Sequence, residues 1–209
     1  MWDLCGSLWK FLESLVFTPE DIYRAITDNN LILLRNLIRL GYDVNYRYIN
    51  HLGEVVYTPL YLSVVCKNTP CLLILLEAGA QLDIVCHLEE SETALDFAIF
   101  RDDRSIIRLL IYAGSRWRGE DPEKSPVDDN QREFIESVTS SAERLAQLLR
   151  EIKDDQNFDR LVLLQREALE IIDSFARDEK DEEIVAYYHG DIYSICRSID
   201  EMRIKEHDR

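Results

Sequence analysis

The stretch TPLYLSVVCKNTPCLLILLEAGA, Thr58 to Ala80, recurs 35 residues later as TALDFAIFRDDRSIIRLLIYAGS, Thr93 to Ser115. Both copies begin with Thr, carry Leu two residues later and reach a Gly 21 residues after the Thr. A third copy, EDIYRAITDNNLILLRNLIRLGY, lies upstream from Glu20 to Tyr42 and keeps the Gly in the same place. Self-similarity of this length predicts stacked repeats, each too small to bury its apolar faces alone.

Each copy is expected to form two short helices. In the middle copy Thr58 can cap the first helix, with Pro59 at its first position. Gly79 can end the second helix in a left-handed conformation, as the equivalent glycines can in the other copies. At the break between the helices, we expect an Asn or Asp in each copy to take the left-handed turn: Asn30, Asn68 and Asp103.

The pattern TPLxLxx…LLxxGA with this period resembles the ankyrin repeat, over residues 18–117. The resemblance implies an all-α fold, with a short helical solenoid that carries β-hairpin fingers. The chain departs from the family pattern at two positions. The usual His after TPL is replaced by Tyr61 and Asp96, and the usual Gly between the helices by Lys67 and Asp102.

The link between the first two copies, from Asn45 to Thr58, is longer than such repeats usually have. It has turn formers between two stretches of β-prone residues, which predicts an extended β-hairpin. The β-prone residues are Tyr46, Tyr48, Ile49, Val55, Val56 and Tyr57, and the turn formers are Asn50, His51 and Gly53. A milder extension occurs between Asp83 and Thr93.

The resemblance also implies where a partner would bind, because ankyrin-like proteins commonly use finger tips and the ends of the first helices. Together with the long finger, the matching positions are Tyr46, Arg47, Tyr48, His51, Tyr57, Val65, Cys66, Glu92, Phe100 and Arg101, and less clearly Thr27 and Asp28. Tyr, Phe and Arg commonly anchor protein interfaces. The alternatives are that these side chains pack against neighbouring fingers, or that the second half of the chain covers them.

The second half of the chain is the more acidic. Residues 1–118 hold 15 Asp/Glu and 11 Lys/Arg, a net charge of −4, whereas residues 119–209 hold 25 and 13, a net charge of −12. We expect a linker over residues 118–130, and then an acidic module of three antiparallel helices over residues 131–209.

Apolar residues with helical spacing support these three helices. The first stripe is Ile135, Val138, Ala142, Leu145, Leu149 and Ile152; the second is Phe158, Leu161, Ala168, Ile172 and Phe175, with Gln165 filling a gap; the third is Val185, Tyr188, Ile192, Ile195, Ile199 and Met202.

Two parts of this organisation depend on local signals. Ser140 and Glu143 form an S-x-x-E capping box, so residues 131–152 are either one long helix or a degenerate fourth repeat. The apolar residues of segment 1–17 are expected to form a helix that caps the first repeat.

Several function classes find no support in the residues. The net charge of −16 disfavours binding to nucleic acid. No histidine, cysteine or carboxylate pattern indicates a metal site, cofactor or catalytic residues, so we expect no enzyme. No run of 18 apolar residues predicts a membrane span. The five cysteines are expected to be small buried residues in a reducing compartment, the cytoplasm or the nucleus.

These observations favour a non-enzymatic, protein-binding adaptor or inhibitor whose partner is another protein. One alternative is a scaffold that forms a homodimer through residues 131–204. Another is a pathogen or viral effector that mimics host ankyrin proteins.

Overall fold

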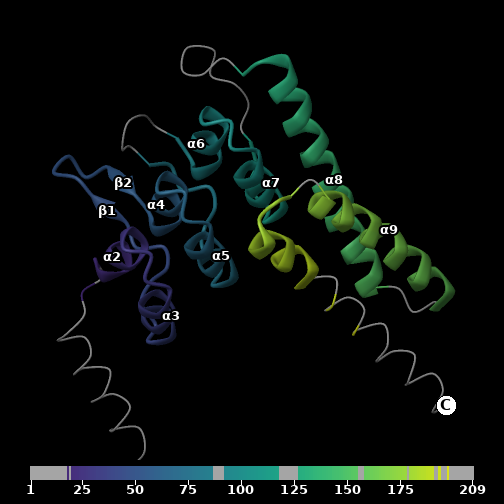
Figure 1. Ribbon diagram of the computed structural model, residues 1–209, viewed down its shortest axis with the longest axis horizontal. Coiled ribbons are helices and arrows are strands. Elements are labelled where there is room, and N and C mark those ends of the chain that lie inside the picture. The colour runs from purple at the N-terminus through teal and green to yellow at the C-terminus, as the bar shows by residue number, and fades with distance from the viewer. Residues whose placement is uncertain are drawn as a thin grey trace, which may run out of the picture. The chain divides into compact units, whose positions relative to one another are not determined.

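The computed structural model describes residues 18, 20–86, 92–117, 127–154, 158–177, 179–190, 193 and 197 (Figure 1). These residues are mostly helical, with a two-stranded antiparallel sheet. The expected helix at 1–17, most of the 118–130 linker, the middle of the second link and most of the third stripe lie outside them. The chain divides into two compact units, Met1–Arg101 and Asp102–Arg209, which are described separately.

The first unit is built from two layers of short helices and one hairpin. The first helices of the three copies are α2 (Asp21–Thr27), α4 (Pro59–Val65) and α6 (Ala94–Phe100). They pack in that order, α2 on α4 and α4 on α6 (Figure 1). The second helices of the first two copies, α3 (Leu31–Arg39) and α5 (Thr69–Glu77), pack on each other.

The core of this unit lies between the two layers, where apolar side chains from both are removed from water. Each such side chain contributes about 1.5–3 kcal/mol when fully buried. The largest fully buried ones are Ile22, Ile26, Leu34, Leu37, Leu60, Tyr61, Leu72, Leu75 and Leu95.

The helix ends confirm the expected caps. The Thr58 hydroxyl accepts a hydrogen bond from the Tyr61 N–H, and Pro59 occupies the first helical position. Thr93 forms a capping box with Asp96, in which each side chain bonds the other's backbone. Gly79 has a φ of +78°, which only glycine adopts without strain, and the glycines at the same place in the other copies also have positive φ.

The turn between the two helices of each copy differs from the expectation by one residue. Asn30, Asn68 and Asp103 do not take the left-handed conformation; each caps the second helix by accepting an N–H three residues on. The preceding residues take it: Asn29 at a φ of 51°, Lys67 at 53° and Asp102 at 49°. An N-cap residue needs a negative φ for its side chain to reach that N–H, so the left-handed residue must precede it.

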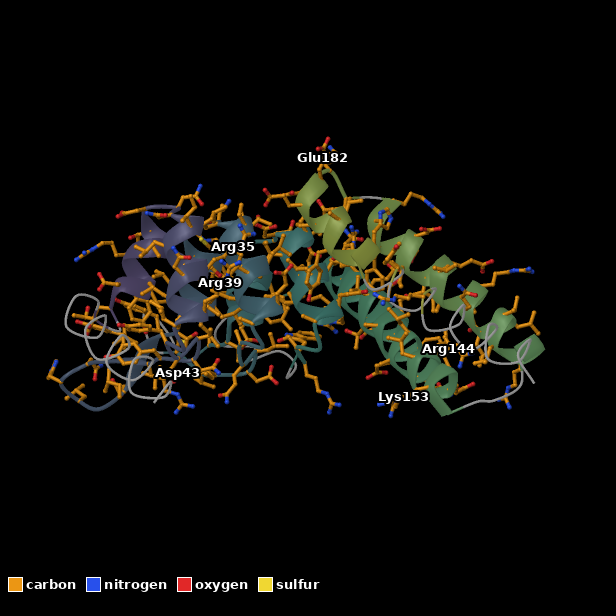
Figure 2. The ribbon with its side chains drawn as sticks, turned by 90° about the horizontal axis from the view of Figure 1, so that it is seen from below. Arg35, Arg39, Asp43, Arg144, Lys153 and Glu182 are labelled. Atoms are coloured by element: carbon orange, nitrogen blue, oxygen red, sulfur yellow. The ribbon has the colours of Figure 1, made fainter. Side chains whose placement is uncertain are left out.

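The second unit contains α7 (Arg104–Tyr112), α8 (Asp129–Asp154), α9 (Phe158–Arg177) and a helical segment over 182–190. α7 packs on α8, and α8 packs on α9. Two ion pairs join α8 to α9: Arg144–Glu167 at 2.7 Å and Glu151–Arg160 at 3.7 Å. The residue that comes later in α8 pairs with the residue that comes earlier in α9, so the two helices are antiparallel. Figure 2 marks Arg144 on α8.

α8 is one continuous helix of 26 residues, which confirms the long-helix alternative for residues 131–152. Ser140 lies in its interior, so the S-x-x-E pattern does not start a new helix. The degenerate fourth repeat is therefore wrong.

The buried stripes of these helices are shifted by one residue at three positions. The fully or nearly fully buried residues are Leu148 instead of Leu149, Leu164 instead of Gln165, and Ile184 instead of Val185. Apolar neighbours occur next to each position, and adjacent helical residues point about 100° apart. Spacing alone therefore did not decide which neighbour faces the core.

A buried ion pair ties α7 to the segment after α9. The side chains of Arg108 and Glu179 are 11% and 2% exposed, and their charged atoms lie 4.0 Å apart. The Ser105 hydroxyl donates to the other Glu179 oxygen at 3.1 Å, and Arg108 donates to the Phe175 carbonyl at 3.4 Å. The Arg108 guanidinium also lies 5.6 Å from the centre of the Phe134 ring.

The division between the units falls inside the third copy, between α6 and α7, and not in the expected linker over residues 118–130. Its cause is packing, because α7 lies against α8 within the second unit.

Candidate protein-binding surface

The long link between the first two copies forms the expected hairpin. β1 (Tyr48–Ile49) pairs antiparallel with β2 (Val55–Tyr57), with Tyr48 opposite Tyr57 and Ile49 opposite Val55. β2 therefore contains one extra residue, Val56, which makes a bulge.

The hairpin turn is held by the side chain of Asn50. Its amide oxygen accepts from the Leu52 N–H at 2.9 Å and from the Glu54 N–H at 3.1 Å. Its amide nitrogen donates to the Glu54 carboxylate at 3.0 Å, and Gly53 adopts a φ of +82°. These bonds fix the conformation of residues 50–54 before any partner arrives.

One face of the hairpin packs on α2 through a tyrosine cluster, defined as Tyr23, Tyr46, Tyr48 and Tyr57. Tyr48 and Tyr57 stack at 5.0 Å with 4° between their rings, and both meet Tyr23 edge to face. The buried Tyr23 hydroxyl donates to the Tyr46 carbonyl at 2.8 Å. Burial raises the pKa of Tyr23 and of Tyr57. Three expected binding residues, Tyr46, Tyr48 and Tyr57, thus help hold the hairpin.

The opposite face of the hairpin carries Ile49 and Val55, because residues paired directly across two strands share a face. Arg47 follows the same alternation and is exposed. Ile49 is 53% exposed, and Leu52 in the turn is 70% exposed beside the exposed His51.

Ile49 and Leu52 were missed as site residues by the sequence analysis. Successive side chains of a strand point to opposite faces, so the sequence could have predicted that Ile49 faces away from the side that carries Tyr48.

Two other expected binding residues, Glu92 and Arg101, contact aromatic side chains of α4 and α6. The Tyr61 hydroxyl donates to the Glu92 carboxylate, and the Tyr61 ring lies 5.5 Å from Phe97. The Arg101 guanidinium stands 5.2 Å from the Phe97 ring centre. Glu92 also bonds through its backbone to Cys86. Glu92 and Arg101 are therefore partly engaged within the unit.

The ends of the first helices give a row of equivalent positions. The last residue of each helix and the one after it are half-buried Val65 with exposed Cys66 in α4, and exposed Phe100 with exposed Arg101 in α6. The same positions in α2 are the exposed Thr27 and Asp28. Phe100 is 59% exposed, the largest apolar side chain of the row.

The row and the hairpin lie at opposite ends of α4. The hairpin precedes its first residue, whereas Val65 ends it, and seven residues of helix span about 10 Å. The structure thus brings Tyr46, Tyr48 and Tyr57 together in one cluster, and Val65, Cys66, Phe100 and Arg101 in another place.

An open groove of about 720 Å³ lies between the hairpin and the second link. Its lining consists of Arg47 and Val55 from the hairpin and of the consecutive residues 79–85. The Gln81 N–H is bonded to the Asn45 side chain at 2.7 Å, which fixes one end of the link against the start of the hairpin.

The three cysteines that the structure describes have a raised thiol pKa, which disfavours the nucleophilic thiolate. Cys71 and Cys86 are buried as expected, and burial raises the pKa of the Cys71 thiol to about 11. Cys66, in contrast, is exposed and not a core residue, because it follows the end of α4; partial burial still raises its pKa. Cys5 and Cys196 lie outside the described residues.

Within the described ranges, no group of three His, Cys, Asp or Glu side chains could hold a metal ion. No helix in these ranges has the length and apolarity needed to cross a membrane. Comparisons of this chain with models of protein families, with curated proteins and with solved structures found no match.

Proposed function

We propose that this chain is a non-enzymatic adaptor or inhibitor that binds another protein through the hairpin of its first unit. Its scaffold would be a short ankyrin-like solenoid, and the row Val65, Cys66, Phe100 and Arg101 would extend the contact. The observation that carries the proposal is the pair of exposed apolar side chains, Ile49 and Leu52, on a hairpin that is otherwise held in place.

The hairpin has the two properties that tight binding needs. Its conformation is fixed by the tyrosine cluster on one side and by Asn50 in the turn, so little entropy is lost on association. Its free side offers apolar surface next to Arg47 and His51, and each apolar side chain buried by a partner is worth about 1.5–3 kcal/mol.

The net charge of −16 fits a protein partner better than a nucleic acid, whose phosphates would repel it. A cytoplasmic or nuclear setting is part of the proposal, in keeping with free thiols at Cys66, Cys71 and Cys86.

The test compares two exposed apolar sites in affinity capture from lysate, with the full chain as bait. The double variant Ile49→Asp/Leu52→Asp should lose a captured protein by about 100-fold or more, since two buried apolar contacts are removed. Leu163→Asp is the matched control, because Leu163 on α9 is a similarly exposed leucine, at 62%. It should leave capture unchanged.

Thermal unfolding of all variants checks that the fold persists. Capture that survives Ile49→Asp/Leu52→Asp would contradict the proposal. Replacing Tyr46 or Tyr48 would be less informative, because both contact Tyr23 and their loss would also loosen the hairpin.

A second candidate function is a homo-oligomerising scaffold in which the acidic helices, as a three-helix bundle, form the interface. The observation in its favour is the exposure of Leu163 on α9, away from the face packed on α8. Light scattering over a wide concentration range would detect a dimer of the full chain. A dimer that Leu163→Asp converts to a monomer would support it, and a strict monomer would exclude it.

A further inference from the structure

The groove between the hairpin and the second link has one wall made by a continuous stretch of chain. Residues 79–85 all line it in sequence, and Leu82, Ile84 and Val85 are half-buried. Seven consecutive lining residues mean that the main chain of the link runs along the groove.

That main chain has unused hydrogen-bond donors. Among the residues that the structure describes, no protein acceptor bonds the N–H groups of Leu82, Ile84 or Val85. The neighbouring Gln81 N–H, in contrast, is bonded to Asn45. In extended backbone the N–H groups of Leu82 and Ile84, two residues apart, point to the same side, and such a pair is what an added β-strand satisfies.

The other wall of the groove supplies side-chain contacts. Val55 lies in the groove, and Ile49 continues the same face of the hairpin toward the tip. Strand side chains alternate, so a strand laid against residues 82–85 would present every second side chain to this apolar face.

The groove is lined by one basic side chain, Arg47, on the hairpin and by one acidic side chain, Asp83, on the link. Arg47 is exposed, and it makes no ion pair with any residue described in the structure. A guanidinium in this setting favours a carboxylate, which it can bind with two parallel hydrogen bonds.

We propose that this groove binds an extended segment of a partner protein, which adds a strand to residues 82–85, places alternate apolar side chains on Ile49 and Val55, and bonds Arg47 through one acidic residue. The inference rests on the proposed function and names the chemistry of its partner. A helical segment fits less well, since its own backbone groups are already paired and leave the N–H groups of Leu82 and Ile84 unsatisfied.

The test uses the full chain and a display library of random ten-residue peptides. Peptides enriched on the wild-type chain should share alternating apolar residues and one acidic residue. On Arg47→Glu, the enriched peptides should carry a basic residue at that position, and the original peptides should bind at least tenfold more weakly.

The enriched acidic peptide, made synthetically, then serves as the probe for amide NMR. Its addition should shift the amide signals of Leu82 and Ile84 and slow their hydrogen exchange. Ile84→Pro, which removes one of these N–H groups, should weaken binding about tenfold, whereas Ile84→Ala keeps the N–H and should weaken it less. The amide mapping and Arg47→Glu decide the matter if Ile84→Pro fails to fold.

Three outcomes would overturn the inference. One is the absence of enrichment, or enrichment without an acidic preference. Another is a shift confined to residues 49–52. The third is protection of the 82–85 amides in the peptide-free protein, at any concentration, because the chain itself or a second copy would then fill the groove. Failure here leaves the capture assay with Ile49→Asp/Leu52→Asp intact, so it can be told apart from failure of the proposed function.

Discussion

Lys67 occupies a backbone conformation that L-residues with a Cβ atom avoid. Its φ of 53° lies in the left-handed region, and the equivalent positions hold Asn29 and Asp102, which tolerate this region better. Lysine has no short polar side chain to compensate the strain, which costs about 1–2 kcal/mol. The fold accepts this cost because Asn68, one residue later, both caps α5 and donates to the Ile26 carbonyl at 2.8 Å.

Replacing Lys67 by glycine should therefore stabilise the protein. We expect Lys67→Gly to raise the free energy of unfolding by up to about 1 kcal/mol, since relief of strain outweighs the greater freedom of glycine in the unfolded chain. Urea denaturation would measure it. Lys67→Ala is the control, because it removes the same exposed side chain and keeps the Cβ atom. Equal stability of the two variants would show that backbone strain is not the cause.

For these turns, the residue types could be predicted from the sequence, but not which residue takes the left-handed conformation and which caps the second helix. Asn or Asp serves equally as a helix cap and as a left-handed residue, so Asn29-Asn30 and Asp102-Asp103 fit either assignment. The cap in the middle copy decides it, because only Asn68 can accept the N–H of Cys71. That geometric requirement outweighs the intrinsic preference of Lys67.

Among the elements, α7 shows how a charge pair can fix the position of a helix. Arg108 on α7 and Glu179 after α9 lie almost entirely out of water. Removing one member of a buried pair costs more than the pair contributes, because the other charge is left without a partner.

We expect Glu179→Gln to destabilise the second unit by roughly 3 kcal/mol, although the side-chain volume is kept. Arg108→Met should also destabilise it, and the double variant should be more stable than the two separate losses predict, since no buried charge remains unpaired. A double-mutant cycle by urea denaturation would measure this coupling. Strictly additive losses would mean that the two groups do not interact.

The elements themselves could largely be predicted from the sequence. Threonine, proline and glycine mark the ends of the short helices, and the hairpin follows from β-prone residues on both sides of Asn50 and Gly53. The exact buried faces of α8 and α9 could not, because apolar residues stand next to each other at 148–149 and 162–164. The choice between such neighbours depends on the helix packed opposite, which a single segment does not reveal.

On the scale of the whole molecule, net charge opposes compactness. The chain carries −16, and exposed acids such as Glu170 and Asp173 in the C-terminal half of α9 add to the repulsion between like charges. Salt shortens the range of this repulsion from about 30 Å at 0.01 M to about 10 Å at 0.1 M.

The temperature of unfolding should therefore rise between about 10 and about 100 mM NaCl, because the screening length shortens over this range and weakens the repulsion. Glu170→Gln/Asp173→Asn should unfold at a higher temperature in low salt and gain less from added salt. Calorimetry at both concentrations would measure both effects. A fall in unfolding temperature with salt would mean that ion pairs such as Arg144–Glu167 outweigh the net repulsion.

Much of the candidate site depended on contacts that span the sequence. Tyr46, Tyr48 and Tyr57 were recognisable as aromatic residues of one link, but their packing requires Tyr23, which belongs to an earlier helix. The division of the chain at Arg101–Asp102 was equally out of reach, since it follows from the packing of α7 on α8 and not from composition.

The single extra residue in β2, Val56, lies between two cross-strand pairs that face opposite sides of the hairpin. Tyr57 lies beside Tyr48 while Val55 lies beside Ile49, so a tyrosine side and an aliphatic side coexist on three residues of strand. Deletion of Val56 would leave a regular ladder with the same two pairs, so Tyr57 would still lie beside Tyr48 and Val55 beside Ile49. What the deletion should change is the local twist of the hairpin, which a bulge increases, and with it the direction in which the turn at residues 50–54 projects.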